Sequence, residues 1–153
     1  KSNSTFPELI SAFLKNYYNH EKNQNFLILQ VTSPLLTKIE IEKTIDYIEQ
    51  NNISSLVHVT PALESPFEMV EKTRKKWNFL IKKRLINRQN YKRKFFFITG
   101  SLFFFKRSFY EKFNKIYNLQ SKFYVVDRIN FIDIDDKFTF ELAKKNIDLK
   151  IRN

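Results

Sequence analysis

The stretch KFFFITGSLFFFKR (94–107) is apolar over most of its length and contains the single glycine of the chain, Gly100. Such a run predicts a strand buried in the middle of a sheet. Its two Phe triplets, 95–97 and 103–105, are therefore expected to be core residues. Gly100 interrupts the run, and a glycine inside a strand often marks a bulge or a close approach of the backbone to a ligand.

Predicted strands and helices alternate on both sides of this run. Segments 67–71 and 77–81 predict a hairpin or an excursion from the main sheet, which we bound at residues 62–93. The alternation predicts an α/β fold with a mainly parallel sheet. Apolar runs predict further strands at 26–31, 54–60, 122–126 and 131–134, and helical spacing of apolar residues predicts helices at 6–19, 39–52, 108–118 and 136–148.

Composition excludes several classes of protein. With 153 residues, 42% of them hydrophobic, the chain is long enough to bury a core as a single domain spanning residues 1–153. It has no cysteine, which excludes disulfide scaffolds and thiolate metal sites. No apolar run approaches the roughly 20 residues of a membrane-spanning helix, and no signal peptide is visible. A soluble cytoplasmic protein is therefore expected.

The net charge of +11 is concentrated in one segment. Residues 72–94 contain eleven Lys or Arg residues and no acidic residue, whereas basic and acidic residues balance elsewhere. The segment is either a solvated charged face or a binding surface for an anion. Trp77 and Tyr91 could stack on nucleic-acid bases. However, no known nucleic-acid-binding motif accompanies them, so nucleic acid is the less favoured partner.

The segment FIDIDDK (131–137) places two carboxylates in an apolar run. On a strand, Asp133 and Asp135 would share a face, and they would repel each other unless one is protonated or a cation lies between them. The alternative is a strand that ends in solvent, with Asp136 capping the next helix. His58 lies in an apolar strand. It is predicted to be a core histidine, or one that contacts site residues without touching the substrate, rather than a catalytic base.

Ligands of such sheets bind beyond the carboxyl ends of the strands. The turn after 26–31, the segment around Gly100 and the FIDID segment fit that rule. If these segments meet at one edge, a single cleft would be lined by Gln30, Thr32, Ser33, Arg88, Asp133 and Asp135.

Four motifs occur in an order that resembles the CMP-sialic acid synthetases, the acylneuraminate or nonulosonate cytidylyltransferases. They are LILQVTSPL (27–35), NRQ (87–89), TGSLF (99–103) and IDID (132–135), the last followed by Phe140 and Ala143. The resemblance covers nearly the whole chain. It implies a three-layer, Rossmann-like nucleotidyltransferase fold. It also implies transfer of CMP from CTP to a nine-carbon sugar acid, with release of pyrophosphate, in capsule or lipopolysaccharide biosynthesis.

The resemblance also implies roles for individual residues. Asp133 and Asp135 would be catalytic ligands of Mg²⁺, a hard cation that prefers oxygen, and Arg88 would lie against the sugar carboxylate or the phosphate. The residues implied to bind substrate are Gln30, Thr32, Ser33, Phe103 and Thr5. The excursion would support a homodimer.

The sequence departs from the family pattern in ways that leave the sugar open. Val31, Leu36 and Thr99 replace a proline, an arginine and an asparagine, and Phe103 replaces a tyrosine. A nonulosonate other than sialic acid, such as legionaminate or pseudaminate, is equally compatible.

The N-terminal Gly- and Lys/Arg-rich loop that cradles the triphosphate in the family has no counterpart, since no glycine precedes Gly100. We therefore expect an N-terminally truncated portion that binds CTP poorly and turns over little. The alternatives are a basic nucleic-acid or anion-binding module, or an inactive truncated relic.

Overall fold

The structure is a computed structural model that describes residues 6–17, 24–81, 93–128 and 131–152. Its elements confirm the predicted alternation, except at 131–134, where the described backbone forms no strand. The helices are α1 (Phe6–Tyr17), α2 (Lys38–Gln50), α3 (Arg107–Phe113) and α4 (Lys137–Arg152), with a short 3-10 helix η1 (Pro66–Glu68). The strands are β1 (Asn25–Leu29), β2 (Ser55–Pro61), β3 (Val70–Lys72), β4 (Trp77–Phe79), β5 (Phe96–Lys106) and β6 (Lys122–Val125).

The main sheet has the strand order β1-β5-β2-β6. β5 is antiparallel to both β1 and β2, and the β2–β6 pair is parallel, so the predicted mainly parallel sheet is wrong. β1, β2 and β6 nevertheless run in the same direction, as the alternation of strands and helices predicts. β5 runs against them, and the described part of the excursion that connects it to β2 contains a hairpin and no α-helix. Antiparallel neighbours need no helical crossover.

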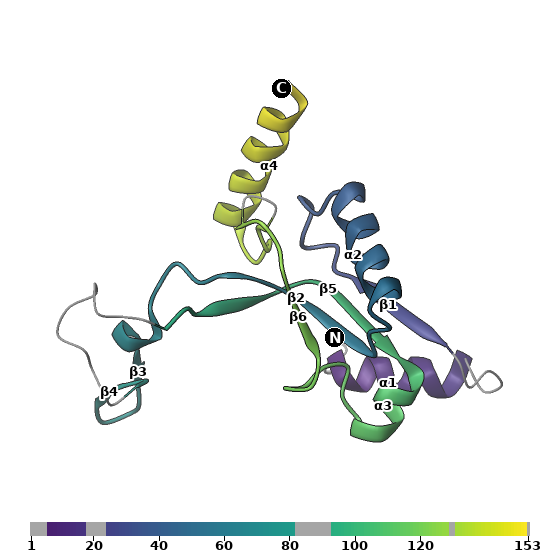
Figure 1. Ribbon diagram of the computed structural model, residues 1–153. Coiled ribbons are helices and arrows are strands. Elements are labelled where there is room, and N and C mark those ends of the chain that lie inside the picture. Colours follow the sequence, from purple (N-terminus) through teal and green to yellow (C-terminus); the bar gives the residue numbers. More distant parts are fainter. Residues whose placement is uncertain (1–5, 18–23, 82–92, 129–130, 153) are drawn as a thin grey trace.

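Helices cover both faces of this sheet (Figure 1). Ile48 of α2 packs on one face, and Phe109 of α3 packs on the other, where α1 adds Ile10 and Leu14. The protein is therefore α/β with a mixed sheet. The buried strand residues are Leu56, Leu102 and Phe104 on the α2 face, and Val57, Phe103 and Phe105 on the α1 and α3 face.

The two Phe triplets of β5 differ in burial. Phe103, Phe104 and Phe105 are buried, as predicted, whereas Phe96 and Phe97 are 47% and 58% exposed. The prediction that both triplets are core is thus wrong for the first. The reason is that the N-terminal part of β5 extends beyond the helices, alongside the excursion (Figure 1).

Gly100 lies in a bulge of β5. β2 advances two residues from Val57 to Val59 while β5 advances five, from Phe103 to Ile98. Gly100 has a φ of +74°, and a Cβ atom there would lie 2.8 Å from Oε1 of Gln30. The predicted bulge is confirmed, and the close neighbour of the glycine is a side chain of the same protein.

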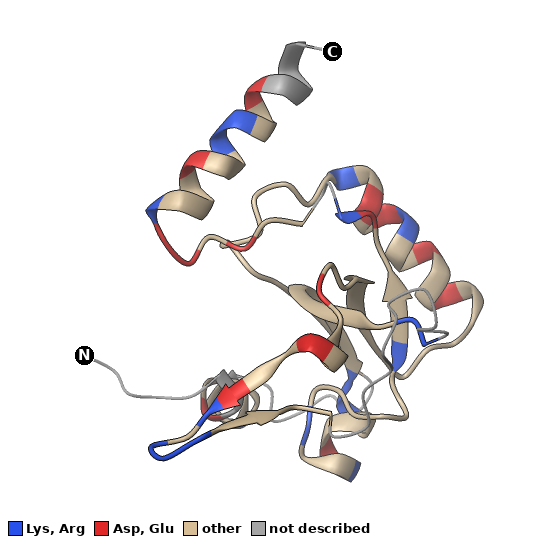
Figure 2. Cartoon of the chain, turned by 90° about the vertical axis from the view of Figure 1, so that its left-hand side faces the viewer, with Lys and Arg blue, Asp and Glu red and all other residues tan. Residues whose placement is uncertain are grey.

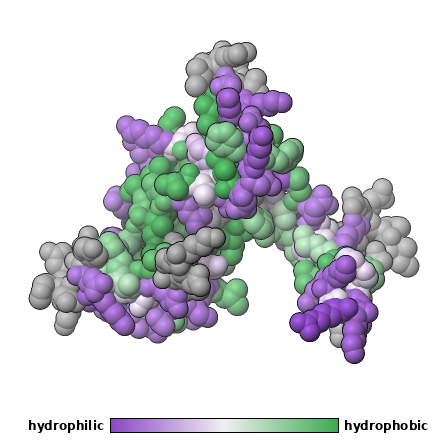
Figure 3. All heavy atoms as spheres, turned by 180° about the vertical axis from the view of Figure 1, so that it is seen from behind, coloured by the Kyte–Doolittle hydropathy of each residue, from purple (hydrophilic) through white to green (hydrophobic). Residues whose placement is uncertain are grey.

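The excursion projects away from the sheet and ends in the β3–β4 hairpin (Figure 1). Seen from behind, it is a separate lobe whose surface is mostly hydrophilic (Figure 3). Figure 2 shows the basic residues gathered at the hairpin turn. Trp77 is 63% exposed there, with the Lys72 ammonium 5.3 Å from its ring centre. The hairpin thus presents an aromatic side chain among cations.

Asp136 caps the start of α4, as one of the two alternatives predicted. Its Oδ1 accepts from the backbone N–H of Thr139 at 2.7 Å, and its own N–H donates to Thr139 Oγ1 at 3.0 Å. The hydrogen bonds that the Thr139 N–H and then the Thr139 hydroxyl donate to the carboxylate lower the pKa of Asp136. None of the described helices is long and apolar enough to cross a membrane.

Candidate functional site

Two of the motif segments meet through a backbone hydrogen bond. The N–H of Ile134 donates to the carbonyl of Thr32 at 2.9 Å, which joins the FIDID segment to the turn after β1. The N–H of Gln30 donates to the carbonyl of Ser101 at 3.3 Å, and its side chain lies over Gly100. All three segments that the sequence places at one edge are therefore neighbours in space.

The hydroxyl groups of Thr32 and Ser33, in the turn after β1, do not cap helix α2. Thr37, not Thr32 or Ser33, is the N-cap of α2, and it forms a capping box with Glu40. Ser33 is 4% exposed, and its Oγ has no hydrogen-bond partner in the described part of the chain. A buried hydroxyl without a partner costs stability, so this one is a candidate for contact with a ligand.

Asp133 and Asp135 line one groove, although the segment that carries them is not the predicted strand. β6 ends at Val125, and the chain then leaves the sheet and crosses to Thr32. Asp133 is partly buried, and its Oδ1 reaches neither solvent nor a hydrogen-bond partner among the residues described; Asp135 is exposed. Figure 2 shows acidic residues gathered where the chain enters α4.

The groove has a volume of about 810 Å³. Its walls come from the end of β2, the start of the excursion, the FIDID segment and α4. Gln30, Thr32 and Ser33 are neighbours of the FIDID segment through Thr32 but do not line the groove. The polar and charged residues that line it are Thr60, Glu64, Arg128, Asp133, Asp135, Thr139 and Asn146.

The donor set fits a cation that keeps much of its own hydration. Among the described residues there is no group of three or more His, Asp or Glu that could enclose a metal ion. Mg²⁺ is usually held by one or two carboxylates together with waters and substrate phosphates. Asp133, with an unpartnered buried oxygen, and Asp135 in the same groove match that pattern.

His58 is fully buried beneath α2, as predicted for a core histidine. Thr44 Oγ1 lies 2.9 Å from its Nε2 and donates to the carbonyl of Glu40, so Nε2 carries the proton. Nδ1 then accepts from Ser101 Oγ at 3.3 Å. Burial lowers the pKa of His58 to about 4. A neutral, doubly hydrogen-bonded ring is a structural group here, since neither nitrogen is free to act as a base.

Phe103 lies in the core on the α1 and α3 face. It is 6% exposed and stacks on Tyr117, with ring centres 5.7 Å apart. It does not line the groove that holds Asp133 and Asp135. A core position explains why this residue is Phe rather than Tyr, since a buried hydroxyl would need a hydrogen-bond partner. The position does not support contact between Phe103 and the sugar. Arg88 and Thr5 lie outside the described residues.

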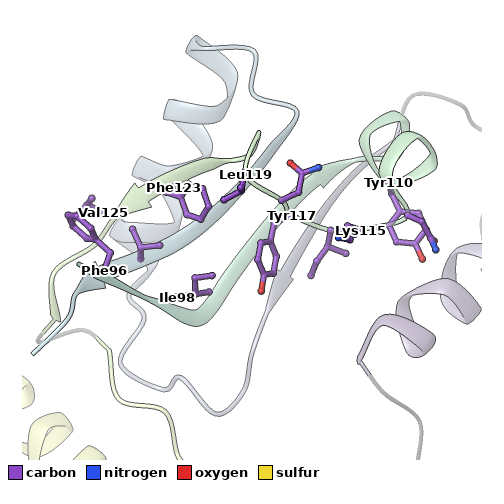
Figure 4. Close-up of a pocket in the computed structure, with 12 residues that line it drawn as sticks. Phe96, Ile98, Tyr110, Lys115, Tyr117, Leu119, Phe123 and Val125 are labelled. Carbon is purple, nitrogen blue, oxygen red and sulfur yellow. The ribbon is translucent and has the colours of Figure 1, made fainter. Parts of the chain in front are cut away.

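A second groove, of about 950 Å³, lies on the α3 side of the sheet and is mostly apolar (Figure 4). Phe96, Phe123 and Val125 form part of its wall, and Lys115 is the charged residue among those that line it. Of the residues predicted to act on substrate, none of those that the structure describes lines this groove. It offers apolar contact but no group of acids or bases.

Two polar residues that line the groove with Asp133 and Asp135, Thr60 and Arg128, were not among the site residues predicted from the sequence. Thr60 is the residue before Pro61 at the carboxyl end of β2, so the rule that ligands bind beyond strand ends could have identified it. Arg128 follows β6 and precedes FIDID, and no motif marked it.

Comparison with known proteins does not identify a family for this chain. Neither the family models nor the curated protein sequences contain a match to this chain.

Proposed function

We propose that the chain belongs to a Mg²⁺-dependent cytidylyltransferase that transfers CMP from CTP to a nonulosonic acid for surface-glycan synthesis. The mixed α/β sheet would then be part of a Rossmann-like nucleotidyltransferase fold. The observation that carries the proposal is the hydrogen bond from Ile134 to Thr32, because it joins the two motifs on which the resemblance depends.

Asp133 and Asp135 hold the metal in this proposal. When bound, Mg²⁺ stabilises negative charge on the phosphate that is attacked. Asp133 is suited to the task because its Oδ1, which has no hydrogen-bond partner among the described residues, gains a ligand. The Ser33 hydroxyl and the Gln30 amide, beside the FIDID segment, orient the substrate. Arg88 remains a predicted contact of the carboxylate or phosphate.

The proposed protein works in the cytoplasm as a homodimer formed through the excursion. Support comes from the exposed face of the hairpin, where Val70 and Phe79 are directly opposite each other and are 48% and 44% exposed. Trp77 adds to the same face, since it lies two residues from Phe79. Apolar side chains on a protruding hairpin are typical of an interface with a partner.

CMP transfer tests the proposal. The complete gene product is incubated with CTP, Mg²⁺ and a series of nonulosonic acids, and pyrophosphate release is measured. We expect Asp133→Asn to lower CMP transfer by at least about 100-fold, because it removes a metal carboxylate. Asp46→Asn, on the exposed side of α2, is the matched control and should leave the rate unchanged. Equal rates for Asp133→Asn and wild type would contradict the metal role.

Nucleic-acid binding is a second candidate because exposed Trp77 lies beside Lys72 on a basic hairpin. Base stacking and phosphate attraction together would give affinity for single strands that falls steeply with salt. Absence of binding to single-stranded RNA or DNA at low salt would exclude it. A complete gene product that folds but neither transfers CMP nor binds nucleic acid would instead be the inactive relic.

A further inference from the structure

Thr60 is a buried polar residue in the floor of the groove that holds Asp133 and Asp135. It is 3% exposed, and its Oγ1 has no hydrogen-bond partner within the described ranges. It pairs with Phe97 across β2 and β5, and Phe97 lines the same groove. Leaving a hydroxyl buried and unpaired costs free energy, so a ligand that supplies its partner is favoured at this position.

Arg128 provides positive charge in the wall of the same groove. It is exposed and lies in the connection between β6 and FIDID. The planar guanidinium presents two parallel N–H donors that match a carboxylate. The groove therefore combines a cation with the carboxylates of Glu64, Asp133 and Asp135. These carboxylates repel an anion, so an anionic group is favoured only next to Arg128.

The rest of the wall is apolar. Phe97 and Phe131 lie with ring centres 6.0 Å apart, and Met69 and Leu142 also line the groove. Apolar surfaces of this kind contact the C–H faces of a carbon chain or ring, while a few polar groups fix its orientation. A small molecule with a carbon skeleton, several hydroxyls and one acid group fits that distribution.

We propose that this groove binds a polyhydroxylated carboxylic acid, with its carboxylate on Arg128 and one hydroxyl on Thr60 Oγ1. The inference rests on the proposed function in that the acceptor is a sugar acid. It adds Thr60 and Arg128 as binding residues and places the acceptor against the end of β2. Asp133 and Asp135, which line the same groove, remain available for the metal.

Binding of N-acetylneuraminate to the 153-residue chain, without CTP or metal, tests the proposal by NMR titration. Thr60→Val should weaken binding about fivefold, as expected for one neutral hydrogen bond, and Thr60→Ser, which keeps the hydroxyl, should preserve it. Thr60→Val should also leave the free energy of unfolding unchanged or raise it, because the hydroxyl lost has no partner among the residues that the structure describes. This separates lost binding from lost folding.

The charge of the ligand provides the second arm. Arg128→Gln should weaken binding about tenfold or more, whereas Arg74→Gln, an exposed arginine outside the groove, should not change it. The methyl ester of N-acetylneuraminate should bind wild type as weakly as the free acid binds Arg128→Gln. Equal binding of acid and ester, no effect of Thr60→Val, or no binding at all would overturn the proposal.

The outcome is distinguishable from failure of the proposed function. Acid binding that depends on Thr60 and Arg128, in a protein that shows no metal binding at Asp133 and no CMP transfer, would support the groove and contradict the cytidylyltransferase. Metal binding at Asp133 with acid binding indifferent to both variants would contradict this inference alone.

Discussion

At the scale of single residues, His58 links the stability of the fold to pH. The ring is fully buried, and desolvation lowers its pKa from 6.5 to about 4. The unfolded chain therefore binds a proton near pH 6.5 that the folded protein does not bind until about pH 4. The contribution of neutral, buried His58 to the free energy of unfolding is fully present above pH 6.5. It is lost as the pH falls from about 6.5 to about 4, and the loss is about 3 kcal/mol in total.

Urea unfolding of wild type and His58→Gln at several pH values between about 7.5 and 4.5 measures this loss. The variant should be less stable at the highest pH, because it disturbs the hydrogen bonds to Thr44 and Ser101. Its stability should fall less steeply as the pH decreases. The same slope in both proteins would show that His58 does not carry the pH dependence.

Gly100 is a second residue-scale test. Its φ of +74° is strained for any residue with a side chain, so Gly100→Ala should lower the free energy of unfolding by about 1–2 kcal/mol. The nearby Gln30 Oε1 is the end of a flexible side chain and can move aside. Combining Gly100→Ala with Gln30→Ala should therefore recover little of the loss. Full recovery would mean that the clash between the alanine Cβ and Gln30, and not the positive φ at position 100, causes the loss of stability.

Individual residues differ in how far the sequence predicts them. The buried His58 and the bulge at Gly100 follow from their places in apolar strands. The oxygens of Ser33, Thr60 and Asp133, which have no partner in the described part of the chain, do not follow from the sequence. Whether a buried oxygen finds a partner depends on segments that meet only in the folded chain. The family resemblance implied that Phe103 contacts the substrate, and the structure places its ring in the core, stacked on Tyr117.

At the scale of elements, α2 depends on the capping box at its start. Thr37 Oγ1 accepts from the N–H of Glu40 at 3.3 Å, and the Thr37 N–H donates to Glu40 Oε2 at 3.0 Å. Thr37→Ala should destabilise the protein by about 1 kcal/mol, whereas Thr37→Ser should retain most of the stability. Thermal or urea unfolding measures both. An alanine variant as stable as wild type would show that packing alone holds α2.

Elements were more predictable than their pairing. Periodicity located the helices and most strands, because it reflects which side chains face the core. It could not give the direction of β5, which depends on how the chain returns from the excursion. Nor could it show that FIDID leaves the sheet, since the apolar residues in that segment are equally compatible with a strand and with an extended connection packed against Thr32.

At the scale of the whole molecule, the net charge of +11 opposes association of two copies. If the chain dimerises through the excursion, raising NaCl from about 50 to about 500 mM should strengthen the dimer, because salt screens the repulsion. Sedimentation velocity measures this. Trp77→Ser should weaken the dimer at either salt concentration. Nucleic-acid binding would show the opposite salt dependence, and a monomer at all concentrations would contradict the dimer.

Binding of Mn²⁺, a paramagnetic substitute for Mg²⁺, shows whether Asp133 holds a metal ion. NMR spectra of the ¹⁵N-labelled chain are recorded at low Mn²⁺ for wild type, Asp133→Asn and the control Asp46→Asn. We predict selective broadening of the amide signals of Thr60, Ile134 and Asp135 in wild type and the control, and its loss in Asp133→Asn. Broadening centred on the acidic residues of α2, or unchanged in Asp133→Asn, would show that Asp133 does not hold the metal.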